Sequence, residues 1–385
     1  MSTTETTTQS RNRKMNITVL GAGIIGLTTA LKFQKHGGYQ VTILAEHFPT
    51  DGKSIKYASL SAGAHHVSTA EDDVKQRAID IETFKTMWDL SADGAAPGCF
   101  LRLPQTEYYR EEPNLDTLKL MTNFKEISKD SLVPGAVAGI TYDSVNSDSP
   151  VLLNYLLSSF LANGGSIVRA SVMHIYQVIE GGPAAFAALN EQEHPPSLYP
   201  LPDGIVVCVG LGAMFLGGVE DKEVYPVRGQ TVLLDAPWVK DSMSLSGKSG
   251  TSKLWTYVIP RKSGTVIVGG TYEANDWHPR PRPETTRDIL ARVLEMHPAI
   301  APPAARESGR KPTVEDVLPI IVEESCGFRP CRKSGPRLES EWIDTGKRRI
   351  PVVHNYGHGG FGYIASYGSA SMSLDLMERA FAQQP

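Results

Sequence analysis

Near its start the chain reads Asn16-Ile17-Thr18-Val19-Leu20-Gly21-Ala22-Gly23-Ile24-Ile25-Gly26, and this stretch decides the fold. The apolar residues up to Leu20 predict a buried strand, and the apolar spacing over 27–36 predicts a helix that two glycines end. A second apolar strand follows over 40–45 and closes with Glu46. Three glycines between a strand and a helix, with an acid about 20 residues on, are typical of a dinucleotide-binding βαβ unit.

The glycines of this motif have separate tasks. Gly21 permits a tight turn, Gly23 lets the backbone approach a pyrophosphate, and Gly26 lets helix and strand pack closely. The helix that follows offers free N–H groups and a partial positive charge to phosphates. Glu46 stands where a carboxylate binds a ribose hydroxyl. A glycine-rich turn without a ligand is the alternative, and the motif alone does not separate FAD from NAD.

The composition is that of a globular protein without a strong electrostatic field. The 385 residues are 41% hydrophobic and 21% charged, with a net charge of -4. No global positive field is present to hold nucleic acid or an anionic membrane, and no apolar run approaches the ~18 residues of a spanning helix. Four cysteines without a Cys-x-x-Cys pair favour a reducing compartment. We expect no metal site.

Nucleotide-type segments at both ends and near residue 205 enclose a strand-rich middle, which predicts two interleaved domains. We expect an α/β Rossmann-type FAD-binding domain over about 15–95, 150–225 and 320–385. A mixed-sheet substrate-binding domain takes about 96–149 and 226–319, and residues 1–14 form a disordered tail. Helices are expected over 72–90, 148–163 and 286–296, an alternating strand-like stretch over 166–178, and an inserted surface loop over 181–204.

A second glycine segment, Gly357-His358-Gly359-Gly360-Phe361-Gly362, follows an apolar strand and precedes a helix. Glycines there let backbone N–H groups approach a flat ring or an anion closely. A flexible hinge is the alternative, although a hinge seldom lies directly between a buried strand and a helix. Glycine segments at both ends of the chain favour an extended cofactor such as FAD.

Several segments together resemble the D-amino-acid oxidase and D-aspartate oxidase family, in the family's order and over nearly all of the chain from residue 15 to 381. The segments that carry the resemblance are Ser61-Ala62-Gly63-Ala64, Val227-Arg228-Gly229-Gln230, Tyr257-Val258-Ile259-Pro260, Val268-Gly269-Gly270-Thr271-Tyr272, Gly327-Phe328-Arg329-Pro330, Gly335-Pro336-Arg337 and Val353-His354-Asn355-Tyr356-Gly357-His358-Gly359-Gly360. Glycine and sarcosine oxidases share the first motif but match these segments less well.

The resemblance implies roles for individual residues. Arg329 takes the position of the arginine that pairs with the substrate α-carboxylate, as a guanidinium does bidentately. Tyr257 takes the position of a supporting tyrosine hydroxyl, and Gly360 that of a carbonyl that receives the substrate amine. A surface ion pair for Arg329 and a core tyrosine for Tyr257 are the alternatives.

The residues expected to contact FAD lie in the two glycine segments, at the end of the second strand, or at positions that the family places along the flavin and the adenine. They are Gly21, Gly23, Ile24, Ile25, Gly26, Glu46, His47, Ser61, Gly63, Ala64, Val172, Gly210, Arg329, Gly359, Gly360, Phe361, Gly362, Tyr363 and Ile364.

Three positions depart from the family pattern. Lys253 stands where animal members carry a lid tyrosine, His65 takes the place of another pocket residue, and His47 replaces a common arginine beside the ribose acid. We place Lys253, His65 and His66 at the rim or wall of the substrate pocket. Because a side-chain carboxylate would find a cationic partner there, these residues favour acidic D-amino acids as substrates.

The expected function is FAD-dependent oxidative deamination of D-amino acids to 2-oxo acids, ammonia and hydrogen peroxide. The alternatives are a specificity of the D-aspartate oxidase type, a non-catalytic flavoprotein and an NAD-dependent dehydrogenase. The expected partners are a small D-amino acid and oxygen, with a homodimer left open. The family implies a peroxisomal place, but the chain ends Ala-Gln-Gln-Pro without a Ser-Lys-Leu signal, so an intracellular and cytoplasmic place is left open.

Overall fold

The computed structural model describes residues 13–67, 73–116, 118–187, 199–249, 252–253 and 255–383, without the side chains of Leu120, Lys248, Ser249, Ser252 and Lys253. The expected tail over 1–14 therefore lies almost wholly outside the described residues. In the described part, no helix has the length and apolar character needed to cross a membrane.

The predicted βαβ unit lies at the centre of a parallel sheet. The sheet runs in the order β16 (Arg337–Asp344), β17 (Arg349–Tyr356), β7 (Gly204–Val207), β1 (Met15–Leu20), β2 (Tyr39–Ala45) and β6 (Ser166–Arg169). All neighbours are parallel except β16 and β17, which form an antiparallel hairpin. The carboxyl ends of β1, β2 and β7 therefore meet at one edge, where α/β sheets bind their ligands.

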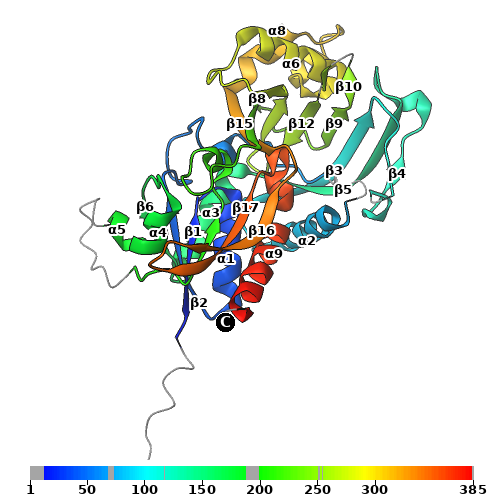
Figure 1. Ribbon diagram of the computed structural model, residues 1–385. Helices are drawn as coiled ribbons and strands as arrows, with labels where there is room; N and C mark the ends of the chain where they lie inside the picture. The colour runs from blue at the N-terminus through cyan, green and yellow to red at the C-terminus, as the bar shows by residue number, and fades with distance from the viewer. Residues whose placement is uncertain are drawn as a thin grey trace, which may run out of the picture.

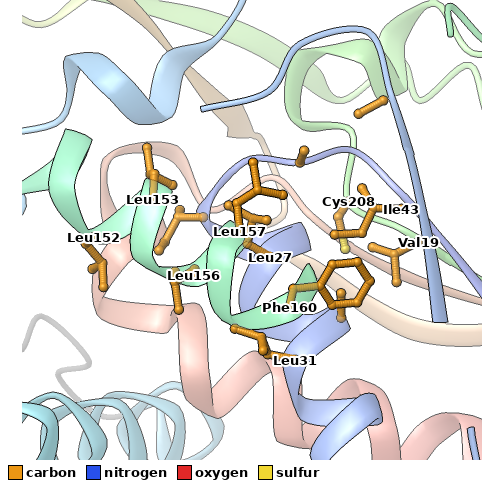
Figure 2. Packing of buried hydrophobic residues seen from close by; sticks show 14 of the residues in the cluster. Val19, Leu27, Leu31, Ile43, Leu152, Leu153, Leu156, Leu157, Phe160 and Cys208 are labelled. Atoms are coloured by element: carbon orange, nitrogen blue, oxygen red, sulfur yellow. The ribbon is translucent and has the colours of Figure 1, made fainter. Parts of the chain in front are cut away.

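Helices cover one face of this sheet. They are α1 (Ile24–His36), α3 (Ser149–Ala162) and α9 (Gly362–Ala382), and α2 (Val74–Leu90) packs on α9. Figure 2 shows Leu156, Leu157 and Phe160 of α3 gathered around Leu27 and Leu31 of α1, all buried. The first and last helices of the chain, α1 and α9, also pack together, which brings the two glycine segments into one region (Figure 1).

The segment after β6 corrects two of our expectations. The alternating stretch 166–178 ends as a strand at Arg169, and α4 (Ile175–Gly181) follows. The expected surface loop over 181–204 contains α5 (Ala184–Ala187). Its Phe186 is buried in an apolar cluster on the face of the sheet opposite α1. Apolar side chains thus anchor both ends of this segment on the far face of the sheet, while residues 188–198 lie outside the described part.

The second sheet is mixed and has nine strands among the described residues. Its order is β14 (Glu273–Ala274), β8 (Val224–Asp235), β13 (Thr265–Gly269), β12 (Thr256–Pro260), β9 (Ser242–Ser246), β3 (Phe100–Tyr109), β5 (Ala138–Ser147) and β4 (Lys125–Glu126), with β15 (Ile321–Arg332) also paired to β8. The short hairpin of β10 (Lys248–Ser249) and β11 (Ser252–Lys253) follows β9.

Two features of this sheet matter for the site. Helix α6 (Pro283–Met296) packs on its outer face, with the short α7 (Pro303–Arg306) and α8 (Val314–Val317) further along the chain (Figure 1). Strand β15, which we assigned to the FAD-binding segments from 320 onward, pairs with β8 in the second sheet. That boundary was therefore misplaced for β15, and the rest of the domain division stays a proposal.

Candidate active site

A cavity of about 1390 Å³ takes its lining from both sheets. All the residues predicted for the site line it except Gly26, which packs behind it, His66, which is buried outside its lining, and Lys253, whose side chain lies outside the described part. Residues far apart in the chain therefore meet around one space. The volume suits an extended ligand together with a small substrate.

The nucleotide end of the cavity is shaped by two glycines of the first motif. Gly21 has φ of 101°, and a Cβ there would lie 2.5 Å from the carbonyl oxygen of Cys208. A Cβ on Gly26 would lie 2.0 Å from the carbonyl oxygen of Gly21. Any side chain at either position would push α1 or the turn out of place, so the helix start can lie beside a ligand only with glycines here.

At the end of β2, Glu46 lines the cavity in a half-exposed cluster with two bases. Its Oε1 lies 3.4 Å from Nζ of Lys56 and 3.5 Å from Nε2 of His47. At this edge of the sheet a carboxylate accepts ribose hydroxyls. With these polar and basic side chains, the end of the cavity near Glu46 suits a polar nucleotide.

The loop over residues 61–64, which was expected to contact the flavin, is held from two sides. The carbonyl of Ala62 accepts hydrogen bonds from the hydroxyl of Ser149, at 2.7 Å, and from the buried Arg261, at 3.0 Å. Ala64 has φ of 64°, an unusual value for a residue with a side chain, and its carbonyl accepts from the N–H of Ser147. The loop is thus fixed against both the helices and the second sheet.

Arg329 and Tyr257 come from β15 and β12 and meet on the cavity wall. Arg329 lies over Gly229 and donates from Nη1 to the carbonyl of Thr271 at 2.9 Å. Burial raises the pKa of Tyr257, and the nearby positive charge of Arg329 offsets only part of that rise. The hydroxyl of Tyr257 therefore stays protonated and can donate beside the guanidinium, which together make a two-point site for a carboxylate.

The second glycine segment turns sharply beside this pair. Gly357 and Gly359 have φ of 88° and 58°, and a Cβ on Gly360 would lie 3.3 Å from Cδ of Arg329. The exposed Gly360 therefore presents its backbone to the same part of the cavity as the guanidinium. The adjacent His358 lies 2.8 Å from Oδ1 of Asn355, and burial lowers its pKa to about 4. The ring of His358 is thus neutral and donates a hydrogen bond to Asn355, rather than acting as a cation.

The structure keeps His65 in the wall but corrects our view of its charge. Its ring lies 6.2 Å from that of Tyr257, and burial lowers its pKa to about 4, so it is neutral near pH 7. Its buried Nδ1 has no hydrogen-bond partner among the described residues. His66 was placed at the rim and is instead buried, with Nε2 3.2 Å from the carbonyl oxygen of Asp80.

Sequence reasoning missed an acidic residue in the wall. Glu107 on β3 is buried, lines the cavity, and accepts hydrogen bonds from the hydroxyls of Tyr109, at 3.0 Å, and Tyr142. Burial raises the pKa of this carboxyl. Only the register could have revealed it: Glu107 pairs with Ser244, and Ser244 with Tyr257, so the three side chains share one face.

Sequence reasoning also missed a group of aromatic rings beside Arg329 and Tyr257, the pair that we call the carboxylate clamp. The ring of Trp255 lies 5.9 Å from that of Phe361 and 6.4 Å from that of Tyr272, and all three line the cavity. They come from three separate parts of the chain. Their rings give this part of the cavity, next to Arg329, an apolar wall.

These features fit FAD. A glycine cradle at a helix start, a carboxylate at the end of β2 and a second glycine segment more than 300 residues later line one elongated cavity. In the part of the chain that the structure describes, no cluster of three or more His, Cys, Asp or Glu could hold a metal ion.

Residues 16–376 match the family model described as FAD dependent oxidoreductase. The chain belongs to the FAD-dependent oxidoreductase family. This oxidoreductase is 36% identical to a D-aspartate oxidase of Cryptococcus neoformans var. grubii serotype A, over 94% of this chain and 97% of that protein. It is 32% identical to a D-amino-acid oxidase of Schizosaccharomyces pombe, over 95% of this chain and 97% of that protein.

Solved structures agree on the fold. A glycine oxidase from Geobacillus kaustophilus superposes with a TM-score of 0.67 at 16% identity, covering 95% of each chain. The predicted Rossmann-type α/β fold with a second, mixed sheet is therefore confirmed, as is FAD as the cofactor of the family. The NAD-dependent alternative does not agree with the family match.

Proposed function

We propose that this oxidoreductase catalyses the oxidative deamination of D-amino acids, with acidic D-amino acids such as D-aspartate as preferred substrates. The observation that carries the proposal is the meeting of Arg329 and Tyr257 beside Gly360 in the cavity lined by the two glycine segments. A flavoprotein that only bound its cofactor would need no carboxylate clamp there. The names of the two relatives support the same reaction.

The residues of the chain bind and orient the substrate. The guanidinium of Arg329 and the hydroxyl of Tyr257 donate to the α-carboxylate, and the carbonyl of Gly360 accepts from the amine. Bound FAD supplies the acceptor for the hydrogen and electron pair that leave the α-carbon. When the amine arrives neutral, no Asp, Glu or His has to act as a base. The rings of Trp255 and Phe361 form an apolar wall beside this step.

The side-chain preference rests on His65 and on the most similar of the two relatives named above. His65 lines the cavity, and its ring offers a hydrogen-bonding nitrogen to a substrate side chain there. In the tautomer that carries its proton on the nitrogen nearer the cavity, the neutral ring donates to a side-chain carboxylate without being charged. His65 lies close enough to Tyr257 to serve the short side chain of D-aspartate.

A broader activity on neutral D-amino acids is the second candidate, and Glu107 favours it. The described contacts of this buried carboxyl are tyrosine hydroxyls rather than a basic group, and Glu111 and Glu112 line the same cavity. This end of the cavity disfavours a further negative charge. A substrate side chain that extends past His65 towards these glutamates would therefore have to end in an uncharged group.

The test is a peroxide assay of the holoenzyme with D-aspartate, D-alanine and D-methionine, in the wild type and in His65→Ala. We expect the highest kcat/KM for D-aspartate, and a selective loss of that activity by about tenfold in the variant, in line with one lost hydrogen bond to a charged group. If neutral D-amino acids are preferred tenfold or more, the broader activity is correct. No peroxide with any D-amino acid would refute the reaction itself.

A further inference from the structure

One arginine of the outer helix reaches the chain segments that flank the clamp, at the start of β12 and just after β13. Arg292 lies on α6, with its side chain 14% exposed. Its Nη1 donates to the hydroxyl of Thr256 at 2.7 Å and to the carbonyl of Trp255 at 3.4 Å, and its Nη2 donates to the carbonyl of Gly270 at 3.3 Å. Figure 1 shows α6 above β12, which begins at Thr256.

The acceptors flank both halves of the clamp. Trp255 and Thr256 come directly before Tyr257 at the start of β12, and Gly270 comes directly before Thr271, whose carbonyl anchors Arg329. The N–H of Gly270 in turn donates to the carbonyl of Trp255 at 2.8 Å. One guanidinium therefore joins the backbone segments that aim the tyrosine and the arginine.

The fit around the tyrosine hydroxyl leaves little freedom. A Cβ on Gly269 or Gly270 would lie 2.4 or 2.5 Å from that hydroxyl, so any shift of this turn displaces it. Strand β12 begins directly after Trp255. Its pairing with β13 runs from Tyr257 to Pro260, so Trp255 has no ladder partner in β13. Without Arg292, the hydrogen bond between Gly270 and Trp255 would be left to hold the two ends together.

We infer that Arg292 is the positioning residue of the carboxylate clamp, although it touches no substrate. The inference rests on the proposed function for the role of Arg329 and Tyr257. A guanidinium is suited to the task because its planar fork meets several carbonyl and hydroxyl oxygens at once, whereas a lysine offers a single point charge. Asp288 accepts from Nε of Arg292 at 2.9 Å, but its side chain is 58% exposed, so this pair contributes little to the placement of the guanidinium.

The experiment compares Arg292→Met with two controls on the same helix. Arg287→Met removes an exposed arginine that pairs with Glu315, and Asp288→Asn keeps the guanidinium. For Arg292→Met we expect KM for the D-amino acid, and the dissociation constant of propionate followed by flavin absorbance, to rise about tenfold, while FAD content is kept. Arg292→Lys should recover part of this loss, and both controls should stay within about twofold of wild type.

A double-mutant cycle with Tyr257→Phe separates positioning from general destabilisation. If Arg292 acts through the tyrosine, Arg292→Met should weaken propionate binding much less in the Tyr257→Phe background than in the wild type. Equal losses in both backgrounds, or an Arg292→Met variant that binds propionate like Arg287→Met, would overturn the inference. A wild type that binds no propionate would instead refute the clamp and with it the proposed function.

Discussion

At the scale of single residues, Arg329 decides whether the cavity holds a carboxylate. We expect Arg329→Ala to lower kcat/KM by at least about 10 to 150-fold, since a hydrogen bond to a charged group contributes about 1.5–3 kcal/mol before orientation is counted. Arg329→Lys should also be impaired because a lysine cannot form a fork. Steady-state kinetics with the best D-amino acid checks this.

The flavin spectrum is the control for both variants. Arg329 has its described anchor in the carbonyl of Thr271, between β13 and β14, so its loss should leave FAD bound. An alanine variant with near-normal kcat/KM would mean that the α-carboxylate binds elsewhere.

At the scale of elements, the junction of β1 and α1 determines whether the cofactor can bind. We expect Gly26→Ala to lose most of its FAD, because the new Cβ would lie 2.0 Å from the carbonyl oxygen of Gly21 and force α1 away from the strand. The absorbance ratio of flavin to protein after gel filtration measures the loss. In the wild type the flavin should be released on denaturation, since we expect non-covalent FAD.

Gly52→Ala is the matched control for that substitution. It replaces a glycine of the same half of the chain that has no atom within 4 Å of a new Cβ and no positive φ. Full FAD occupancy in Gly26→Ala would show that the close packing of α1 on the strand is not needed for binding.

At the scale of the whole molecule, buried titratable groups set the response to pH. His65, His66 and His358 have pKa values lowered by burial from 6.5 to about 4. Between these values the unfolded chain binds more protons than the folded one, so stability falls as the pH drops from 6.5 towards 4. Each histidine contributes at most about 3 kcal/mol to this loss. Urea unfolding of the holoenzyme across this range should show it.

Glu107 acts in the opposite direction. Burial raises its pKa above 4.5, so the folded state keeps a proton that the unfolded state releases, and stability falls as the pH rises from 4.5. Glu107→Gln removes this opposing contribution. We therefore expect the variant to lose stability more steeply than the wild type between pH 6.5 and 4.5, and an equal or shallower slope would contradict the assignment.

The sequence by itself determined the local parts of this protein. The strand, turn and helix around Gly21 follow from apolar spacing and from glycines placed where side chains would clash, which are short-range effects. The resemblance placed Arg329, Tyr257 and the segment from 359 to 364, and the structure brings them to one cavity. These positions could be read because each lies in a contiguous motif.

The tertiary structure alone decided which other residues join them. Glu107 faces the cavity because of the register of β3, β9 and β12, and Arg292 reaches the clamp because α6 packs on β8, β12 and β13. The charge of His65 and the burial of His66 likewise depend on neighbours distant in the chain. Strand register and helix docking arise from long-range packing, which no local pattern of residues encodes.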